Sequence, residues 1–283
     1  MTINASDIEE YLQTRSDFDL ELFVYRTLRE RGFSVAHGGT YIDPATTKPR
    51  QYDLRAYGLL SRTFGFGVHL SIECKSLSTD APLVISRVPR PTSDSYHELI
   101  HVHKDPQASP PEVRIAREQK ERGIYRPFNQ VGKRTAQVRR DQGGRGFKDD
   151  DRESYEKWSQ ALSSAADLVR ESAEAQPSAD LYVSILPILV VSDDTLWVVD
   201  YSEEGKRLGP PKPTDEAELF VDRDYPIRSL NNWQAGPLVY HISHLHIFTR
   251  TGLVSFLSQL TDRTGSRLEA LIFDFVLREF DRP

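Results

Sequence analysis

The sequence contains a single cysteine, Cys74, among 283 residues, and it has no long uninterrupted apolar run. One cysteine can form neither an intrachain disulfide nor a zinc site of several thiolates. A membrane-spanning helix needs about 18 or more consecutive apolar residues, so none is expected. The first residues also lack the basic and apolar segments of a secretory signal. We therefore expect a cytoplasmic protein that folds in a reducing setting and binds no membrane.

An excess of positive charge is also missing, since the formal net charge is −6. Overall electrostatics therefore do not attract a polyanion. Any binding of nucleic acid must come from a local basic patch, because affinity depends on the phosphates neutralised at the contact. With 38% hydrophobic residues the chain can bury a substantial core. No internal repeat and no clear linker divides it, so we expect one domain over residues 1–283.

The most informative pattern lies in the strand expected over residues 68–75. Apolar and polar residues alternate there, which is typical of a half-buried strand. A period of two places Glu73 and Lys75 on one face, roughly 6–7 Å apart. Asp53 lies on the preceding expected strand, over residues 50–57, which can pair with the first. Charges on a half-buried strand are costly without a partner, so these residues indicate a metal or phosphate site.

The periodicity of the remaining chain predicts the other elements. A helix over 17–31 and a strand over 33–42 precede the two strands named above, and the three strands should form an antiparallel meander. Residues 77–112 contain six prolines and are expected to form an irregular insertion near the site. The later predicted elements are a helix at 151–174, a hairpin of strands at 181–191 and 196–201, a polar loop at 202–217, a strand at 238–248, and helices from about 252 and over 266–280.

Positive charge gathers between residues 111 and 148. Within this segment, residues 129–140 are predicted to form a helix. Lys133, Gln137 and Arg140 are spaced i, i+4, i+7 and would share one face of it. Such a face can bind a nucleic-acid backbone. The alternative is a basic helix that faces only solvent.

Histidines fall into two groups in the sequence. Those within the insertion, His97, His101 and His103, belong either to a zinc site or to a polar helical turn. Those on the strand at 238–248, His241, His244 and His246, belong either to the core or edge of a sheet or to a metal site.

Asp53 and the segment Ser71-Ile72-Glu73-Cys74-Lys75 together resemble the motif of the PD-(D/E)XK nuclease superfamily. In that motif an aspartate is followed, on a later strand, by two apolar residues, a glutamate, any residue and a lysine. The predicted order of helix, three strands, helix and strand is also similar. Tyr52 stands where the name-giving proline would stand.

The resemblance covers residues 17–76 well and 128–201 in outline. It implies an α/β fold with a restriction-endonuclease-like αβββαβ core, in which a mixed central sheet is flanked by helices. The insertion at about 77–112 and C-terminal additions would extend this core. The resemblance also implies a glutamine or lysine on the helix after the motif strand, for which Gln137 is the candidate.

The implied catalytic residues are Asp53, Glu73 and Lys75. The implied metal ligands are oxygen atoms of Glu21, Asp53 and Glu73 and the carbonyl of Cys74. Ligation by oxygen alone suits the hard cations Mg²⁺ and Mn²⁺. The metal would activate a water and polarise the phosphate, while Lys75 would orient that water or neutralise developing charge.

These expectations describe a metal-dependent endonuclease with nucleic acid as its partner, DNA before RNA. The alternative is an inactive domain of the same fold that binds nucleic acid or another protein. Whether the chain forms a homodimer or requires a partner protein stays open. The basic segment is the element on which either nucleic-acid function depends.

Overall fold

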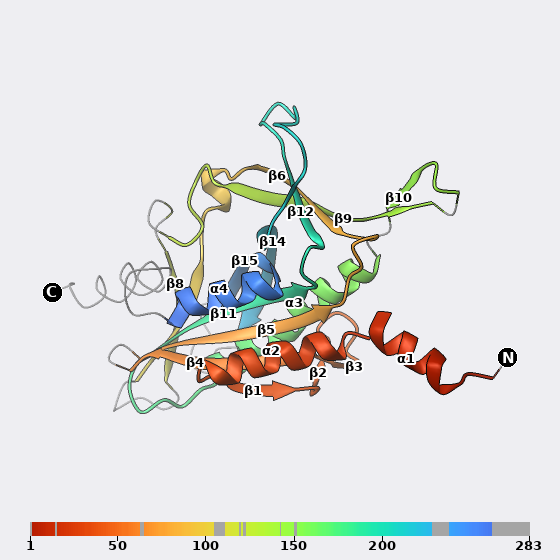
Figure 1. Ribbon diagram of the computed structural model, residues 1–283. Helices are drawn as coiled ribbons and strands as arrows, with labels where there is room; N and C mark the ends of the chain where they lie inside the picture. Colours follow the sequence, from red (N-terminus) through yellow and green to blue (C-terminus); the bar gives the residue numbers. More distant parts are fainter. Residues whose placement is uncertain are drawn as a thin grey trace.

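The computed structural model describes the chain apart from residues 1, 15, 63–64, 105–110, 119, 121–122, 142, 150–151, 228–237 and 262–283. Within the described residues the protein is α/β, with four helices and one large mixed sheet (Figure 1). The helices are α1 (Ala5–Thr14), α2 (Phe18–Glu30), α3 (Arg152–Ala173) and α4 (Arg250–Thr261). The strands are β1 (Ser34–His37), β2 (Thr40–Ile42), β3 (Pro49–Gln51), β4 (Leu54–Ser61), β5 (Phe66–Lys75), β6 (Leu83–Pro89), β7 (Glu98–His103), β8 (Glu112–Arg117), β9 (Gln130–Arg140), β10 (Phe147–Asp149), β11 (Leu181–Val191), β12 (Leu196–Asp200), β13 (Lys212–Pro213), β14 (Glu216–Ile227) and β15 (Leu238–Thr249).

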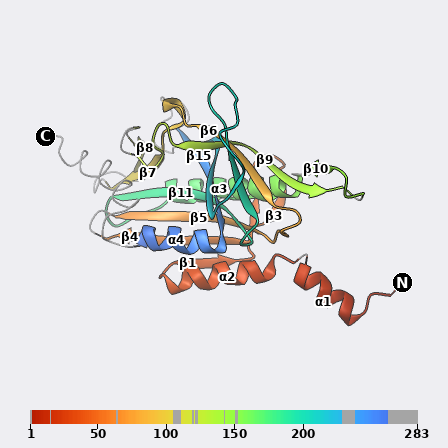
Figure 2. The ribbon, with the colours of Figure 1, turned by 45° about the horizontal axis from the view of Figure 1, so that its top comes forward.

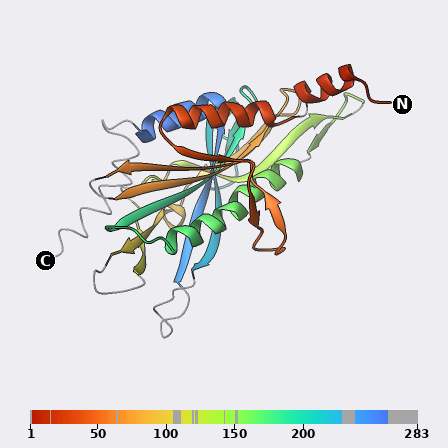
Figure 3. The same cartoon turned by 90° about the horizontal axis from the view of Figure 1, so that it is seen from below.

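Four neighbouring strands, in the order β1-β4-β5-β11, carry the sequence motif. The strands β1, β4 and β5 pair antiparallel, whereas β11 runs parallel to β5. A parallel pair needs a long crossover, and α3 is the helical part of the one between β5 and β11. Figure 3 shows α3 on one face of these strands and α2 with α4 on the other.

Alternation along β5 decides which layer each side chain enters. The apolar members are fully buried in a cluster that also contains residues of α2 and α4: Val68, Leu70, Ile72 and Cys74. The side chains between them face α3, since the Ser71 hydroxyl donates to the carbonyl of Ala161 at 2.7 Å. Glu73 therefore lies on the α3 side of the sheet, and the predicted alternation is confirmed.

The sheet continues from β11 through β15, β14, β9, β6 and β12 to β13, and β7 with β8 attaches beside the start of β11. The hairpin of β9 and β10 projects from the body of the protein (Figure 1). No helix that the structure describes is long and apolar enough to cross a membrane.

Several predicted elements are confirmed, namely those observed as α2, β4, β5, α3, β11, β15 and α4. The strand expected over 33–42 is divided into β1 and β2, and β2 pairs with β3 in a separate two-stranded sheet. The sequence patterns did not indicate α1 or β14. The helix expected over 266–280 lies outside the described residues.

The helix predicted over 129–140 is wrong, because these residues form strand β9. β9 pairs antiparallel with β6, so its backbone hydrogen bonds go to a neighbouring strand. The register shifts near Lys133, and such a bulge disguises the strand period of two. Lys133, Gln137 and Arg140 therefore share no helix face.

Two further predictions fail for a related reason, since the pairing partners are distant in sequence. The expected irregular insertion at 77–112 contains β6 and β7, which join the large sheet. Pro82 and Pro89 stand at the two ends of β6, where proline is tolerated. The strand at 196–201, observed as β12, forms no hairpin with β11 and instead pairs with β6 and β13.

Candidate active site

Asp53 and Glu73 are held against each other at the paired ends of β4 and β5. The backbone N–H of Asp53 donates to Oε1 of Glu73 at 3.3 Å. The N–H of Cys74 donates to Oδ2 of Asp53 at 2.8 Å. The pairing of Leu54 with Ile72 sets this register, so the sheet itself brings together the two carboxylates that the motif singled out.

Glu73 is the most deeply buried charged group of the site, with 1% of its surface exposed. Within the described chain no donor hydrogen-bonds its Oε2 atom, which lies 3.5 Å from the ammonium of Lys157. Burial raises the pKa of Glu73 well above its usual range, and the charge of Asp53 raises it further. Burial and the Glu73 charge also raise the pKa of the Tyr41 hydroxyl to about 12. The arrangement favours a cation beside Glu73.

Lys157 of α3 belongs to this carboxylate cluster, and the motif did not reveal it. Its Nζ atom lies 2.7 Å from Oδ2 of Asp53 and 3.8 Å from Oδ2 of Asp17. Burial alone would lower the pKa of Lys157, but the charges of Asp53 and Glu73 raise it overall. A sequence signal existed, because Lys157 lies three residues after Ser154 and four before Ala161, both on the buried face of α3.

Asp17 reaches the site from the start of α2. Asp17 stands at the N-cap position of this helix, but its carboxylate makes no capping hydrogen bond. Its Oδ1 instead accepts the backbone N–H of Ser76 at 2.6 Å, and its Oδ2 lies 3.8 Å from Nζ of Lys75. Burial raises the pKa of Asp17. Lys75 also pairs with Glu153 of α3 at 3.3 Å, so it lies at the edge of the carboxylate cluster.

Glu21 and Cys74, the other two expected metal ligands, have different surroundings. Glu21 lies on α2, one turn after Asp17. Its Oε2 atom lies 2.8 Å from Nε2 of His37 on β1. The thiol of Cys74 is buried in the apolar cluster, which raises its pKa. Only the carbonyl of Cys74 is therefore suited to bind a hard cation, as the resemblance implied. Ligation by Glu21 stays a prediction.

A groove of about 1000 Å³ opens beside Lys75, and its walls come from α1, the segment after β5, and the hairpin of β9 and β10. Two aromatic side chains that line it are strongly exposed, Tyr11 at 58% and Phe147 at 72%. The guanidinium of Arg140 lies over the ring of Phe147, 5.2 Å from its centre. The groove thus combines exposed rings with charges of both signs, since Lys75, Arg139 and Arg140 line it together with Glu10, Asp80 and Glu153.

Of the three residues expected to bind nucleic acid, Gln137 and Arg140 both line the groove, whereas Lys133 lies elsewhere in the fold. Arg140 lines the groove as an exposed cation. Gln137 is buried, its amide donates to the carbonyl of Ala81 at 3.1 Å, and it does not face solvent. Lys133 pairs with the carboxylate of Asp94 and lines a different, smaller cavity. At the groove, Arg140 is thus the exposed cation and Gln137 lies buried in the wall, while Lys133 is elsewhere.

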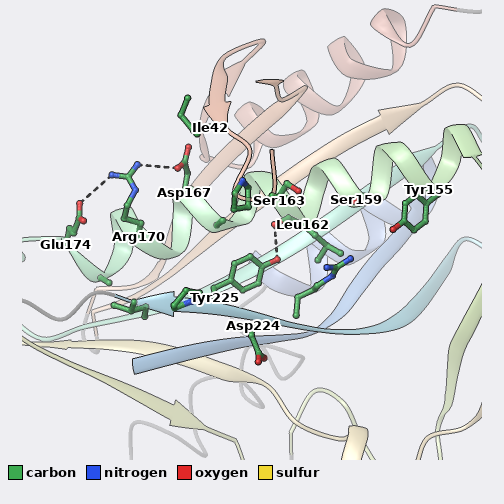
Figure 4. A pocket seen from close by; sticks show the side chains of 17 residues that line it. Ile42, Tyr155, Ser159, Leu162, Ser163, Asp167, Arg170, Glu174, Asp224 and Tyr225 are labelled. Carbon is green, nitrogen blue, oxygen red and sulfur yellow. Dashed lines mark hydrogen bonds and ion pairs between the residues drawn. The ribbon is translucent and has the colours of Figure 1, made fainter. Parts of the chain in front are cut away.

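A second cavity, of about 790 Å³, lies between α3 and the end of β14 (Figure 4). Tyr225 lines this cavity, and its hydroxyl donates to the carbonyl of Leu162 at 2.8 Å. Arg170 pairs with Asp167 and Glu174 along its rim. Its lining includes none of the residues that surround Asp53.

The oxygen atoms at the site fit a hard, hydrated cation. Among the described residues, no three ligand atoms of this cluster lie within 4.8 Å of one another. Asp53 and Glu73 could thus supply two oxygens, with waters for the other positions, and Mg²⁺ usually keeps several waters. Oε2 of Glu73 accepts no hydrogen bond within the described residues, and such a cation would bind this atom.

Comparisons with family models, curated proteins and solved structures gave no match to this chain.

Proposed function

We propose that the chain is a divalent-metal-dependent nuclease that hydrolyses phosphodiester bonds, with DNA as the first substrate to test. The observation that carries the proposal is the joint fixing of Asp53 and Glu73. Reciprocal backbone hydrogen bonds hold the two carboxylates together, and two lysines stand beside them. Carboxylates and a lysine in this arrangement suit phosphodiester hydrolysis.

The order of elements supports a restriction-endonuclease-like core. α2, β1, β4, β5, α3 and β11 follow one another as αβββαβ once the β2–β3 hairpin and the segments from β6 to β10 are set aside. The resemblance implies a glutamine or lysine on the helix after the motif strand. Lys157 is a lysine on α3, the helix after the motif strand, whereas Gln137 lies on strand β9.

Mg²⁺ or Mn²⁺ would be held by carboxylate oxygens of Asp53 and Glu73 and by the carbonyl of Cys74, with an acid from α2 in support. That acid is Asp17 by its position near Lys157, or Glu21 by the resemblance. When bound, the cation would lower the pKa of a water and polarise the scissile phosphate.

The protein's own groups supply the remaining chemistry. Lys75 would orient the attacking water or neutralise charge that develops on the phosphate. Lys157 compensates the charge of Asp53 and Glu73 and keeps both carboxylates in place. Arg140 and Phe147, which line the groove next to Lys75, would hold the substrate strand by charge and by stacking.

One contact favours an alternative, a domain of this fold that binds nucleic acid or a protein without cutting. The ammonium of Lys157 already neutralises Asp53 at 2.7 Å, and such a pair can persist without any metal. A homodimer or a partner protein that delivers the domain to its substrate is compatible with both proposals.

Cleavage assays separate the two. Supercoiled plasmid, linear DNA and RNA are incubated with the full chain in Mg²⁺ or Mn²⁺. Asp53→Ala, Glu73→Ala and Lys75→Ala are expected to abolish cleavage, whereas the exposed controls Glu203→Ala and Lys206→Ala are expected to retain it. Binding without cleavage in both metals, or cleavage that survives all three substitutions, contradicts a nuclease at this site.

A further inference from the structure

A second group of ligating side chains lies at the far end of the sheet from Asp53. His101 and His103 belong to β7, and Asp180 immediately precedes β11. One ligand atom from each of these three residues lies within 4.8 Å of the other two. In the described part of the chain this is the only group of three such residues that meets this distance.

The pairing of two strands explains why the three side chains meet. Residues two apart on a strand face the same side, so His101 and His103 project together from β7. Leu181 pairs with Val102 across the antiparallel β7–β11 contact, which brings Asp180 beside both imidazoles. Figure 2 shows β7 and β8 beside β11, at the end opposite α1.

The distances, which are also those of histidine–aspartate hydrogen bonds, suit a metal site. Nε2 of His101 lies 3.3 Å from Oδ2 of Asp180, and Nδ1 of His103 lies 3.0 Å from both carboxylate oxygens. Nitrogen and oxygen ligands at about 2.0–2.1 Å from a tetrahedral Zn²⁺ lie roughly 3.3 Å apart. With all three ligand atoms within 4.8 Å of one another, the group can hold one ion.

The surrounding contacts hold the ligands in place. The ring of His101 is buried and stacks on Tyr182, with centres 4.2 Å apart and an angle of 7° between the planes. Oδ1 of Asp180 accepts the backbone N–H of Lys104 at 2.9 Å. Outer contacts of this kind orient metal ligands in known sites.

We propose that His101, His103 and Asp180 bind one first-row transition metal ion, with Zn²⁺ as the expected occupant. Two imidazoles and one carboxylate are a common catalytic zinc set, which leaves a fourth position for water. That position faces outward, because the side chains of His103 and Asp180 are 40% and 31% exposed. Nitrogen ligands also distinguish this site from the all-oxygen site at Asp53.

The two sites are independent. Along the parallel pair, Tyr182 lies opposite Phe66 and Leu189 lies opposite Glu73. At about 3.3 Å per residue, the seven residues from Phe66 to Glu73 span roughly 23 Å. Zinc binding by the histidines thus neither requires nor supports nuclease activity.

The test is a calorimetric titration of Zn²⁺ into the full chain after chelation, in excess Mg²⁺ so that the carboxylate site does not contribute. One Zn²⁺ per chain is expected. His103→Ala and Asp180→Asn should weaken binding at least about 100-fold, since loss of an outer partner alone typically costs 10- to 100-fold. Both substitutions are at partly exposed side chains, and thermal unfolding checks that the variants are folded.

Two controls make the result specific. His241→Ala removes a histidine paired with Asp224 at 2.5 Å, which belongs to no three-ligand group among the described residues, and Zn²⁺ affinity should be unchanged. Asp53→Ala should also leave it unchanged. Co²⁺ should give a visible absorption band in the wild type that His103→Ala abolishes. Absence of Zn²⁺ binding to the wild type, or wild-type affinity in His103→Ala and in Asp180→Asn, overturns the proposal.

Discussion

Nζ of Lys157 lies 2.7 Å from Oδ2 of Asp53, although the two residues are 104 positions apart in the chain. The contact joins the start of β4 to α3. Two carboxylates about 4 Å apart repel by roughly 4 kcal/mol at an effective dielectric near 20, so a cation between them has a large effect. Lys157 supplies that cation within the protein itself, and a bound divalent ion would add to it or displace it.

Lys157→Met should destabilise the metal-free protein by about 3 kcal/mol, because it leaves buried carboxylates without their counter-charge. Added Mg²⁺ should recover part of this loss, since a divalent ion binds the folded state and restores the positive charge. The measurement is urea unfolding of wild type and variant, with chelator and with Mg²⁺.

The exposed Lys206→Met is the matched control, and it should be neutral in both conditions. If Mg²⁺ stabilises Lys157→Met no more than the wild type, the carboxylates do not bind the ion.

Glu73→Gln should stabilise the metal-free protein above neutral pH while it abolishes cleavage. The raised pKa of Glu73 means that the folded state binds more protons than the unfolded state, from the ordinary carboxyl pKa up to the raised one. Stability therefore falls as pH rises through that window and stays reduced above it. A glutamine loses no proton, so the decline disappears, and the variant is expected to be more stable than the wild type near pH 8.

Urea unfolding at several pH values in chelator measures this effect, with the exposed Glu203→Gln as control. A Glu73→Gln variant that is less stable than the wild type near pH 8 would show that the charged form of Glu73 is favoured, contrary to the burial argument.

Local pattern was sufficient where the decisive interaction is local. The alternation along β5 predicted both the strand and the face that carries Glu73, because a period of two is a property of the strand itself. Asp53 could be paired with it because β4 and β5 are consecutive and antiparallel. The two carboxylates of the candidate site therefore follow from residues 50–75 alone.

Sequence patterns did not predict the structure correctly where it depends on contacts with a segment distant in the chain. Lys133, Gln137 and Arg140 fit a helix by spacing, but β6 offers β9 a full set of backbone partners and a bulge shifts the register. Lys157 was missed because its role depends on where α3 crosses β5. The place of Asp17 in the cluster was also missed, since its contact with Ser76 joins residues 59 positions apart.

Phe147→Ala should weaken binding of single-stranded DNA about 10-fold and leave the salt dependence unchanged, because a stacked base contributes no counterion release. Arg140→Ala should weaken binding as well, but with a salt slope smaller by about 0.7–1. Fluorescence anisotropy at several salt concentrations, with Ca²⁺ in place of Mg²⁺ to limit cleavage, gives both quantities.

Phe128→Ala is the matched control, because Phe128 is 79% exposed but does not line the groove. Equal losses of affinity in Phe128→Ala and Phe147→Ala would mean that the groove does not hold the strand.

His97→Gln should make the protein less sensitive to acid. Burial, and to a lesser extent the charge of His246, lowers the pKa of His97 to about 3, against an ordinary value of about 6.5. Between these values the unfolded state binds one proton more, so stability falls by about 1.4 kcal/mol per pH unit as pH decreases through the window. A glutamine removes that contribution and can keep the 2.7 Å contact to Ser184.

Urea unfolding between about pH 7 and pH 4 measures the slope. His244→Gln should reduce it in the same direction, since burial also lowers the pKa of His244 well below its usual value. Both substitutions retain a polar side chain, so a change in slope is separable from a uniform loss of stability. A wild-type slope in both variants would mean that these histidines do not become protonated on unfolding, and acid sensitivity would then have to come from other groups.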